Sequence, residues 1–291
     1  MVIQRIAVLL TCFNRREKTL KCLDSVYAQK VADSVRMEVF LVDDGSKDGT
    51  SDAVRLRFDQ VTILTGDGNL FWTGGMRKAW SVALKTGKFD YFWLINDDTV
   101  MYPDALENLL KADAYAMEKF GKSGIYSGST LDPKTKLHSY GGEKLKSIDN
   151  YAAESVLPNG TYQSCEFTNA NILLVPHSVV EKIGIFSEKY IQSIADYDYS
   201  MRVVRAGLPV LILPGYAGEC EYDHTKYEEA EIPPLNKRIR NLYGPKGYSY
   251  NEFLYFVKTF FPKRYLNTFV TFWIRTFFPT LWRRWKRKKI A

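Results

Sequence analysis

The sequence predicts an α/β fold with a mainly parallel central sheet, flanked by helices and followed by a helical C-terminal extension. Three observations predict it. Short apolar runs alternate with helix-like stretches over the first hundred residues, polar clusters directly follow several of these runs, and the composition becomes aromatic and basic beyond about residue 227. Strands separated by helices at this spacing form βαβ units with right-handed crossovers. We therefore expect one domain over residues 1–226 and an extension over residues 227–291.

Strands are expected where short apolar runs are bounded by turn residues, and helices where apolar side chains recur every three or four positions. Leu20, Leu23 and Tyr27 show the helical pattern in the first helix. The expected strands are residues 5–13, 38–42, 61–64, 91–95, 124–128, 171–175 and 209–213. The expected helices are residues 16–29, 49–58, 75–86, 103–119 and 193–207. The turn-rich stretch 129–164 is expected to form a long loop or a small antiparallel insertion.

Composition and charge exclude several classes of protein. With 46% hydrophobic and 14% aromatic residues, the chain can bury a large core, so disorder over its whole length is excluded. The net charge is +7, but ten Lys and Arg and no acidic residue occur from Lys258 onward. Residues 1–257 therefore carry a net charge of −3. This distribution argues against a nucleic-acid-binding body and for a tail that meets an anionic partner.

The four cysteines, Cys12, Cys22, Cys165 and Cys220, form no CxxC pair and have no metal-ligand spacing. Buried free thiols are the expected state, which suits a reducing compartment. The N-terminus is too strand-like for a signal peptide, and no apolar stretch reaches the roughly 18 residues that a membrane span needs. We therefore expect a cytoplasmic protein.

Polar clusters stand where three of the expected strands end. They are residues 11–15 after the first strand, 43–46 after the second and 96–99 after the fourth. Open α/β sheets bind ligands at the carboxyl ends of their strands. The sequence therefore predicts a binding site along this edge of the sheet.

The carboxylates in these clusters allow two interpretations each. Asp43 and Asp44 could form a turn and a helix cap, or hydrogen-bond a base or a ribose. Asp97 and Asp98 follow a very apolar strand, where two adjacent carboxylates are costly unless a cation lies beside them. Carboxylate oxygens suit Mg²⁺ or Mn²⁺, and the alternative is a cap for the helix that begins near Pro103.

Two further groups lie later in the chain. Asp198 can pair with Arg202 one helical turn away, which leaves Asp196 free to act as a general base. His224 follows the last expected strand and is either a surface or packed residue, or a neutral imidazole that completes a metal site.

Together these motifs resemble those of the family 2 glycosyltransferases of the GT-A fold, over about residues 4–225. The resemblance rests on five segments in the family's order: TCFNR (11–15), VDDGS (42–46), GNLFWTGG (68–75), NDD (96–98) and a segment over 186–207 that contains FSE and DYDYSMR. It implies an inverting, metal-dependent enzyme that uses nucleotide sugars. Within the family, the chain is most similar to bacterial capsule and O-antigen transferases, including rhamnosyl- and galactofuranosyl-type enzymes.

The resemblance also implies roles for individual residues. Asp196 matches the catalytic base, while Asp98 and His224 match metal ligands. The matched nucleotide- and donor-binding residues are Thr11, Phe13, Asn14, Arg15, Asp43, Asp44, Gly45, Asn69, Trp72, Gly74, Gly75, Asn96 and Asp97. Two residues depart from the family pattern: Ala195 stands where Glu is frequent, and Asn96 replaces the first acid of the Asp-x-Asp signature.

The expected activity is therefore transfer of a hexosyl or deoxyhexosyl group from a nucleotide-diphosphate sugar to a lipid-linked saccharide acceptor, with Mg²⁺ or Mn²⁺. A nucleotidyltransferase is the first alternative, but residues 10–18 lack the glycine of a phosphate-binding loop. A non-catalytic nucleotide-sugar-binding relative is the second alternative, but it would require loss of Asp98 or Asp196, and both are present.

The tail over residues 253–291 combines many aromatic side chains with basic ones. Lys258, Lys263, Arg264 and Arg275 interrupt the aromatics, and six of the seven residues 283–289 are basic. A helical pair packed on the domain is one interpretation. We favour an interfacial anchor that binds an anionic membrane, which would place the enzyme peripherally on the inner face of the cell membrane.

Overall fold

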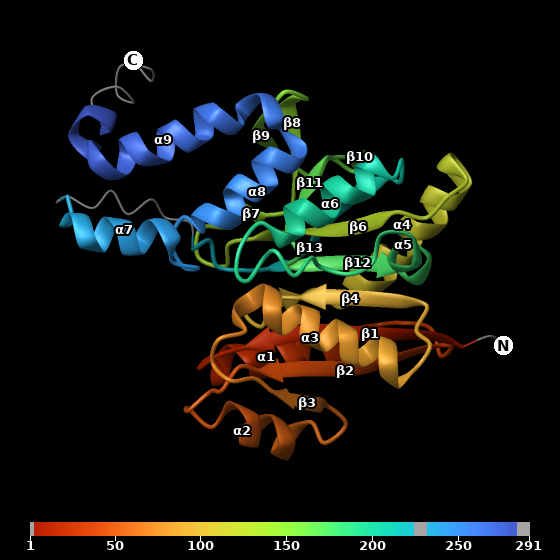
Figure 1. Cartoon of the computed structure of the whole chain (residues 1–291). Coiled ribbons are helices and arrows are strands. Elements are labelled where there is room, and N and C mark those ends of the chain that lie inside the picture. The colour runs from red at the N-terminus through yellow and green to blue at the C-terminus, as the bar shows by residue number, and fades with distance from the viewer. Residues whose placement is uncertain (1–2, 224–231, 284–291) are drawn as a thin grey trace.

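The computed structural model describes residues 3–223 and 232–283. A large central sheet lies between two layers of helices, and a helical extension follows (Figure 1). The strands are β1 (Gln4–Cys12), β2 (Val35–Asp43), β3 (Thr62–Thr65), β4 (Tyr91–Ile95), β5 (Val100–Met101), β6 (Ile125–Leu131), β7 (His138–Tyr140), β8 (Gly142–Ser147), β9 (Asn150–Val156), β10 (Gln163–Ser164), β11 (Phe167–Thr168), β12 (Ile172–Pro176) and β13 (Val210–Glu219). The helices are α1 (Arg16–Tyr27), α2 (Thr50–Arg57), α3 (Phe71–Thr86), α4 (Ala105–Phe120), α5 (His177–Ile183), α6 (Ala195–Arg205), α7 (Leu235–Tyr243), α8 (Tyr250–Phe260) and α9 (Tyr265–Phe277).

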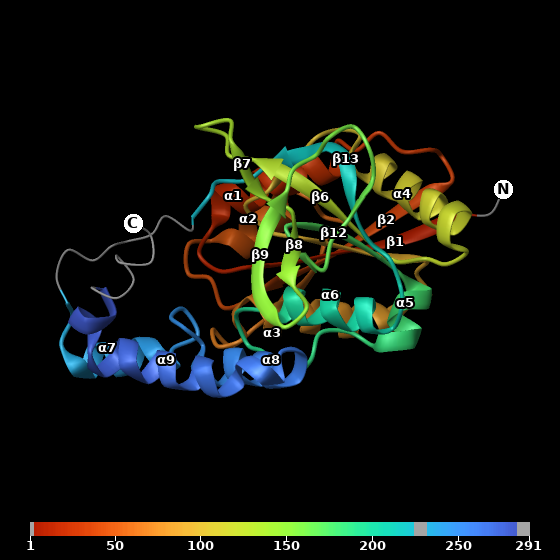
Figure 2. The ribbon, with the colours of Figure 1, turned by 90° about the horizontal axis from the view of Figure 1, so that it is seen from above.

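The core follows from the alternation of side chains along the strands. In β1, Ala7 and Leu9 pack on one face of the sheet, and Ile6, Val8 and Leu10 pack on the other. Figure 2 shows α3, α5 and α6 on the first face and α1, α2 and α4 on the second. Because helices cover both faces of the sheet, the side chains on both faces of these strands are apolar, and the strands are continuous apolar runs in the sequence. The four cysteines are free and buried, as expected.

The order of the main sheet is β10-β13-β6-β12-β4-β1-β2-β3, and its strand directions are mixed. The strands β3, β2, β1 and β4 are parallel, as expected, but β12 is antiparallel to both of its neighbours, β4 and β6. The chain between β6 and β12 contains no crossover helix, so the returning strand runs in the opposite direction. The sheet is therefore less parallel than the sequence predicted.

The stretch 129–164 forms a small antiparallel insertion, one of the two expected outcomes. Its strands β8 and β9 pair with each other, and β8 also pairs with β11, in a separate three-stranded sheet. This sheet contacts α6 through Phe167, whose ring stacks on Tyr197 with centroids 4.7 Å apart. It also contacts the extension, where Tyr151 lies against Phe253 and Phe261. The insertion thus links α6 to the C-terminal helices.

Helix α3 begins at Phe71, four residues before the expected start, so Gly74 and Gly75 lie inside its first two turns. A Cβ added at Gly75 would lie 2.2 Å from Oγ1 of Thr11 at the end of β1. The glycine therefore allows the helix to approach the strand end closely. No apolar periodicity marks this start, because the first turn of α3 is held by backbone and carboxylate contacts rather than by burial.

The extension divides into a packed part and an exposed part. The side chains of Phe256, Val257, Phe260 and Phe261 belong to the main core, so the aromatic residues of α8 stabilise the domain rather than an interface with lipid. This corrects the expectation that the aromatics over 253–285 act together as an anchor. In α9 the buried Thr268, Phe272 and Thr276 face inward, and the opposite side is exposed. No helix in the described ranges is both long and apolar enough to cross a membrane.

Candidate functional site

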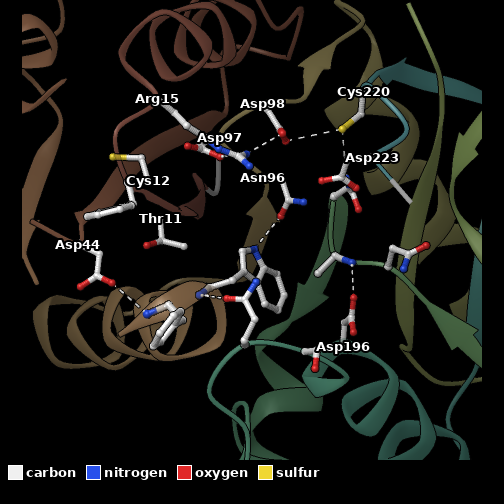
Figure 3. A pocket seen from close by; sticks show the side chains of 18 of the residues that line it. Thr11, Cys12, Arg15, Asp44, Asn96, Asp97, Asp98, Asp196, Cys220 and Asp223 are labelled. Atoms are coloured by element: carbon white, nitrogen blue, oxygen red, sulfur yellow. Dashed lines mark hydrogen bonds and ion pairs between the residues drawn. The ribbon is translucent and has the colours of Figure 1, made fainter. Parts of the chain in front are cut away.

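A pocket of about 530 Å³ lies at the carboxyl ends of β1, β2 and β4, as the strand-end clusters predicted (Figure 3). This volume is within the usual range for small-molecule sites. Nine predicted residues line it: Thr11, Phe13, Arg15, Asp44, Trp72, Asn96, Asp97, Asp98 and Asp196. The start of α3, the loop before α6 and residues of the insertion and the extension complete its wall.

Asp97 and Asp98 share one cation. Nη1 of Arg15 donates to Oδ1 of Asp97 at 3.2 Å and to Oδ2 of Asp98 at 2.7 Å. Burial raises the pKa of Asp97 to about 7, although the positive charge of Arg15 opposes this shift. Asp98 has a further neighbour in Cys220, whose thiol lies 3.7 Å from its Oδ1. Nζ of Lys18 lies 3.9 Å from Oδ2 of Asp98, so Arg15 and Lys18 are the cationic side chains beside this pair of acids.

Asp44, directly after β2, hydrogen-bonds the loop between β3 and α3 and the first residue of α3. Its carboxylate accepts the backbone N–H of Gly68 at 2.9 Å and that of Phe71 at 3.0 Å, which explains why α3 starts early. Asp43 points into the loop instead, where it accepts the N–H of Ser46 at 2.8 Å and the hydroxyl of Ser51. Asp43 therefore makes the contacts of a turn, but it does not cap α2, whose N-cap residue is Gly49.

Trp72 and Asn96 join the two sides of the pocket. Nε1–H of Trp72 donates to Oδ1 of Asn96 at 2.8 Å, and its backbone N–H donates to Oε1 of Gln192 at 3.0 Å. Asn96 thus orients an aromatic ring against the pocket, a task that its amide oxygen performs as well as a carboxylate would.

Asp196 lies across the pocket from the strand-end acids (Figure 3). Its carboxylate accepts the N–H of Tyr197 at 2.9 Å and that of Ala170 at 3.4 Å, and it forms no ion pair within the described part of the chain. Burial raises the pKa of Asp196 to about 6, and the nearby Glu143 contributes in the same direction. A carboxylate with such a pKa can accept a proton near neutral pH.

Asp198, two residues further on, has a different environment. It is buried, accepts Nε–H of Arg202 at 2.8 Å and accepts the hydroxyl of Tyr190 at 2.9 Å. The expected ion pair with Arg202 is confirmed. Asp198 is therefore occupied by structural contacts, and Asp196 faces the pocket.

The remaining predicted residues within the described ranges do not line the pocket. Oδ1 of Asn14 accepts the N–H of Lys47 at 2.7 Å, and Asn69 donates its N–H to Asp67. Gly45 has a φ of +82° and packs against Gly68. Gly74 donates its N–H to the carbonyl of Ile191 at 3.3 Å. His224 lies outside the described residues.

Several lining residues were not predicted. They are Tyr140, Asn169, Asn171, Gln192, Ser193, Ile194, Tyr197, Asp223 and Lys246, in addition to backbone and thiol contributors. Tyr140 donates its hydroxyl to Asp223 at 2.5 Å, which ties the insertion to the end of β13. These residues come from the insertion, the loop before α6 and the extension, and no local sequence signal announces such contributions.

The charges of the pocket test whether a divalent cation fits. The lining holds five carboxylates and only two cationic side chains, Arg15 and Lys246. No cluster of three or more His, Cys, Asp or Glu side chains in residues 3–223 and 232–283 is arranged to hold a metal ion. Mg²⁺ is usually bound by one or two carboxylates together with substrate phosphates, which needs no such cluster. The donor chemistry and the excess of negative charge therefore fit a hard cation at Asp98.

Comparisons with known proteins agree with this geometry. Residues 7–139 match the family model Glycosyl transferase family 2. An uncharacterized glycosyltransferase of Rickettsia felis is 26% identical over 217 residues, which cover 69% of this chain and 31% of the relative. Galactofuranosyltransferase GlfT2 of Mycobacterium tuberculosis is 24% identical over 238 residues, 73% of this chain and 36% of the relative. The chain spans between 27% and 58% of the length of these and similar relatives.

A solved structure shares the fold. The mannosyltransferase PcManGT from Pyrobaculum calidifontis, in complex with GDP-Man and Mn²⁺, superposes with a TM-score of 0.54 at 17% identity, covering 82% of this chain and 61% of that one. The mixed sheet, the flanking helices and the pocket at the strand ends thus define a protein of the GT-A type. Within this fold, residues 7–139 match the model of glycosyltransferase family 2, the family that the strand-end motifs resemble.

Proposed function

We propose that this chain transfers a glycosyl group, with inversion, from a nucleotide-diphosphate sugar to an acceptor hydroxyl. One observation carries the proposal. The paired acids Asp97 and Asp98 face, across a single pocket, a carboxylate that has no cationic partner in the described chain, Asp196. The Asp97–Asp98 pair suits binding of the donor diphosphate with its metal ion, and Asp196 suits removal of a proton from the acceptor hydroxyl.

The donor side uses the strand ends. Thr11 and Asp44 lie where a nucleoside base would enter, and Arg15 and Asp97 lie toward the ribose and diphosphate. A divalent ion, Mg²⁺ or Mn²⁺, held by Asp98 would neutralise the diphosphate of the donor when bound. The mannosyltransferase of the same fold, in complex with GDP-Man and Mn²⁺, supports this arrangement.

The acceptor side uses Asp196. Its carboxylate takes the proton from the acceptor hydroxyl as the oxygen attacks the anomeric carbon. The bond from that carbon to the diphosphate oxygen breaks on the opposite side, so a single displacement inverts the anomeric centre. The raised pKa of Asp196, about 6, gives the carboxylate more basicity than an exposed aspartate has while leaving it ionised at neutral pH.

The acceptor is proposed to be a lipid-linked saccharide of a surface polysaccharide such as a capsule or O-antigen, and the transferred sugar a hexose or deoxyhexose such as rhamnose. Similarity to a galactofuranosyltransferase supports the transfer of a sugar group. A nucleotidyltransferase is disfavoured because residues 10–18 lack the glycine of a phosphate-binding loop. A non-catalytic relative is disfavoured because Asp98 and Asp196 are both present in the pocket.

A panel of nucleotide sugars with Mn²⁺ or Mg²⁺ tests the proposal. At least one donor is expected to raise the unfolding temperature only when the divalent ion is present, and to be hydrolysed slowly in water. Nucleoside triphosphates serve as the control. Turnover of a triphosphate, together with failure of every sugar nucleotide, would favour a nucleotidyltransferase.

We further propose that α9 holds the enzyme on an anionic membrane. Its outward side carries exposed apolar residues at helical spacing: Leu266, Phe269, Val270, Ile274 and Phe277, followed by Phe278 and Leu281. Basic residues recur in the same stretch of sequence, and no acidic residue occurs after position 258. An apolar stripe flanked by basic residues is typical of helices that lie in a membrane interface, where each basic residue contributes about 1 kcal/mol.

Point substitutions test this surface better than truncation, because α8 is part of the core. Ile274→Glu and Phe277→Glu are expected to reduce co-sedimentation with phosphatidylglycerol vesicles. Leu56→Glu is the matched control, since Leu56 is 91% exposed on α2, far from α9 (Figure 1). Vesicle co-sedimentation that does not change with these substitutions, with lipid charge or with salt concentration would refute the membrane site. Concentration-dependent dimers lost in the same variants would assign the stripe to a second copy of the chain instead.

A further inference from the structure

The loop that leads from α5 to Asp196 is held firmly on one side by α3. The N–H of Thr73 donates to the carbonyl of Ile191 at 3.0 Å, and Nη1 of Arg77 donates to the carbonyls of Ser187 and Tyr190, each at 3.0 Å. Gln192 is bonded to the N–H of Trp72, as described above. This loop therefore forms the wall of the pocket next to Asp196.

The last residue of the loop adopts a strained backbone. Ile194, immediately before α6, has a φ of +66°, in the left-handed region that β-branched residues rarely adopt. Such a conformation persists only where surrounding contacts hold it. Because Ile194 precedes Asp196 by two residues, the contacts that hold the loop also set the direction of the Asp196 carboxylate.

The second side of the loop faces the C-terminal extension. Glu252 in α8 is only 9% exposed, and its carboxylate faces the backbone N–H groups of Ile191, Gln192 and Ser193. Its Oε2 has no hydrogen-bond partner within the described residues. One helical turn further on, Tyr255 lies against Tyr190 with ring centroids 5.9 Å apart.

A simple capping role does not account for Glu252. Glu252 is the third residue of α8, the position from which a glutamate can reach back to the N–H of the N-cap residue. Here the N-cap is Ser249, and its N–H is directed to the carbonyl of Gly244 at 3.4 Å. The carboxylate is instead turned toward the loop, and burying a charge there has a cost that capping would not require.

We propose that Glu252 is a positioning residue for the reaction. From the extension it holds the backbone of residues 191–193 in place, and this backbone in turn fixes the direction in which the Asp196 carboxylate points. The inference rests on the proposed role of Asp196 as the base. It makes α8 a functional part of the active site rather than only a connection to α9. Loss of the carboxylate is expected to loosen the loop while leaving the strand-end donor residues in place.

Hydrogen exchange of the free protein tests the contact without any ligand. In Glu252→Ala, the amides of residues 191–193 are expected to exchange about tenfold faster or more, and in Glu252→Gln by a smaller factor. Leu254→Ala is the matched control, because Leu254 is 7% exposed in the same helix and packs in the cluster of Leu242, Tyr250 and Phe272. This control should lower the unfolding temperature without altering exchange at 191–193.

Turnover of the best nucleotide sugar from the panel completes the test. A shift of the base by about 1 Å can cost roughly a hundredfold, so kcat should fall by up to that factor in Glu252→Ala while donor affinity stays within about twofold. Unchanged exchange, unchanged kcat, or equal losses in Leu254→Ala would each overturn the positioning role. If Glu252→Ala does not fold, Glu252→Gln decides by the same criteria. If the parent protein turns over no sugar nucleotide, the proposed function fails, and the exchange data still decide whether Glu252 holds the loop.

Discussion

Replacing Asp198 by Asn separates its structural role from the catalytic role that we propose for Asp196. The Asp198 side chain is 4% exposed and pairs with Arg202, which is 25% exposed. Breaking a buried ion pair from one side costs about 3–5 kcal/mol. Arg202 keeps its bonds to the carbonyls of Ile183, at 2.7 Å, and Ile185, at 2.9 Å, and the amide of Asn still accepts one bond. We therefore expect Asp198→Asn to cost about 2–3 kcal/mol of unfolding free energy.

For a chain of this size, 1 kcal/mol shifts the unfolding temperature by roughly 2–4 °C, so the variant should unfold roughly 5–10 °C lower. Differential scanning calorimetry measures this shift, and turnover at 25 °C is measured on the same preparation. The folded variant should retain kcat within about threefold, because Asp198 does not line the pocket. A large loss of kcat without a change in unfolding temperature would refute the division of roles.

Three further predictions concern the pocket. The value of kcat/KM should fall as the pH drops through about 6, because protonation of Asp196 removes the base. The residual activity of Asp196→Asn should not show this fall. Profiles of kcat/KM between pH 5 and 8 for the two proteins measure the difference. Gly75→Ala places a Cβ 2.2 Å from Oγ1 of Thr11, so this variant should lose about 1–3 kcal/mol of unfolding free energy and have a higher KM for the donor. Gly215→Ala is the control, because no atom lies within 4 Å of the added Cβ. Equal effects of the two substitutions would contradict the close packing of Gly75 on Thr11. Asp98→Asn should abolish the divalent-ion dependence of donor binding in titration calorimetry, and normal binding and turnover would exclude Asp98 as the ligand.

The half of the fold that carries the donor side was predictable from the sequence. The strands β1, β2 and β4 are apolar on both faces, and each ends in a polar cluster, so their parallel arrangement brings Thr11, Asp44 and Asp97 to one edge. The pairing of Asp198 with Arg202 follows from helical spacing alone, and it indicated which of the two aspartates remains free.

Apart from Asp196, the proposed acceptor side was not predictable, because it depends on tertiary contacts. Tyr140 and Lys246 reach the pocket from the insertion and the extension, about a hundred residues apart in the chain. The aromatics of α8 resembled those of a lipid interface, and only their packing against the sheet insertion and α6 makes them part of the core. A composition rich in aromatic and basic residues does not distinguish a buried helix from an interfacial one, because both require a large apolar face.

The central claim is that Asp196 is the general base in a pocket whose donor site is independent of it. The most direct measurement is the single-turnover rate and the donor dissociation constant of Asp196→Asn at pH 8 with Mn²⁺, using the sugar nucleotide that the parent accepts. We predict a rate lower by about 10²–10⁴-fold and a dissociation constant within about twofold of the parent value. A rate within about threefold of the parent, or an equal loss of donor affinity, would contradict the assignment.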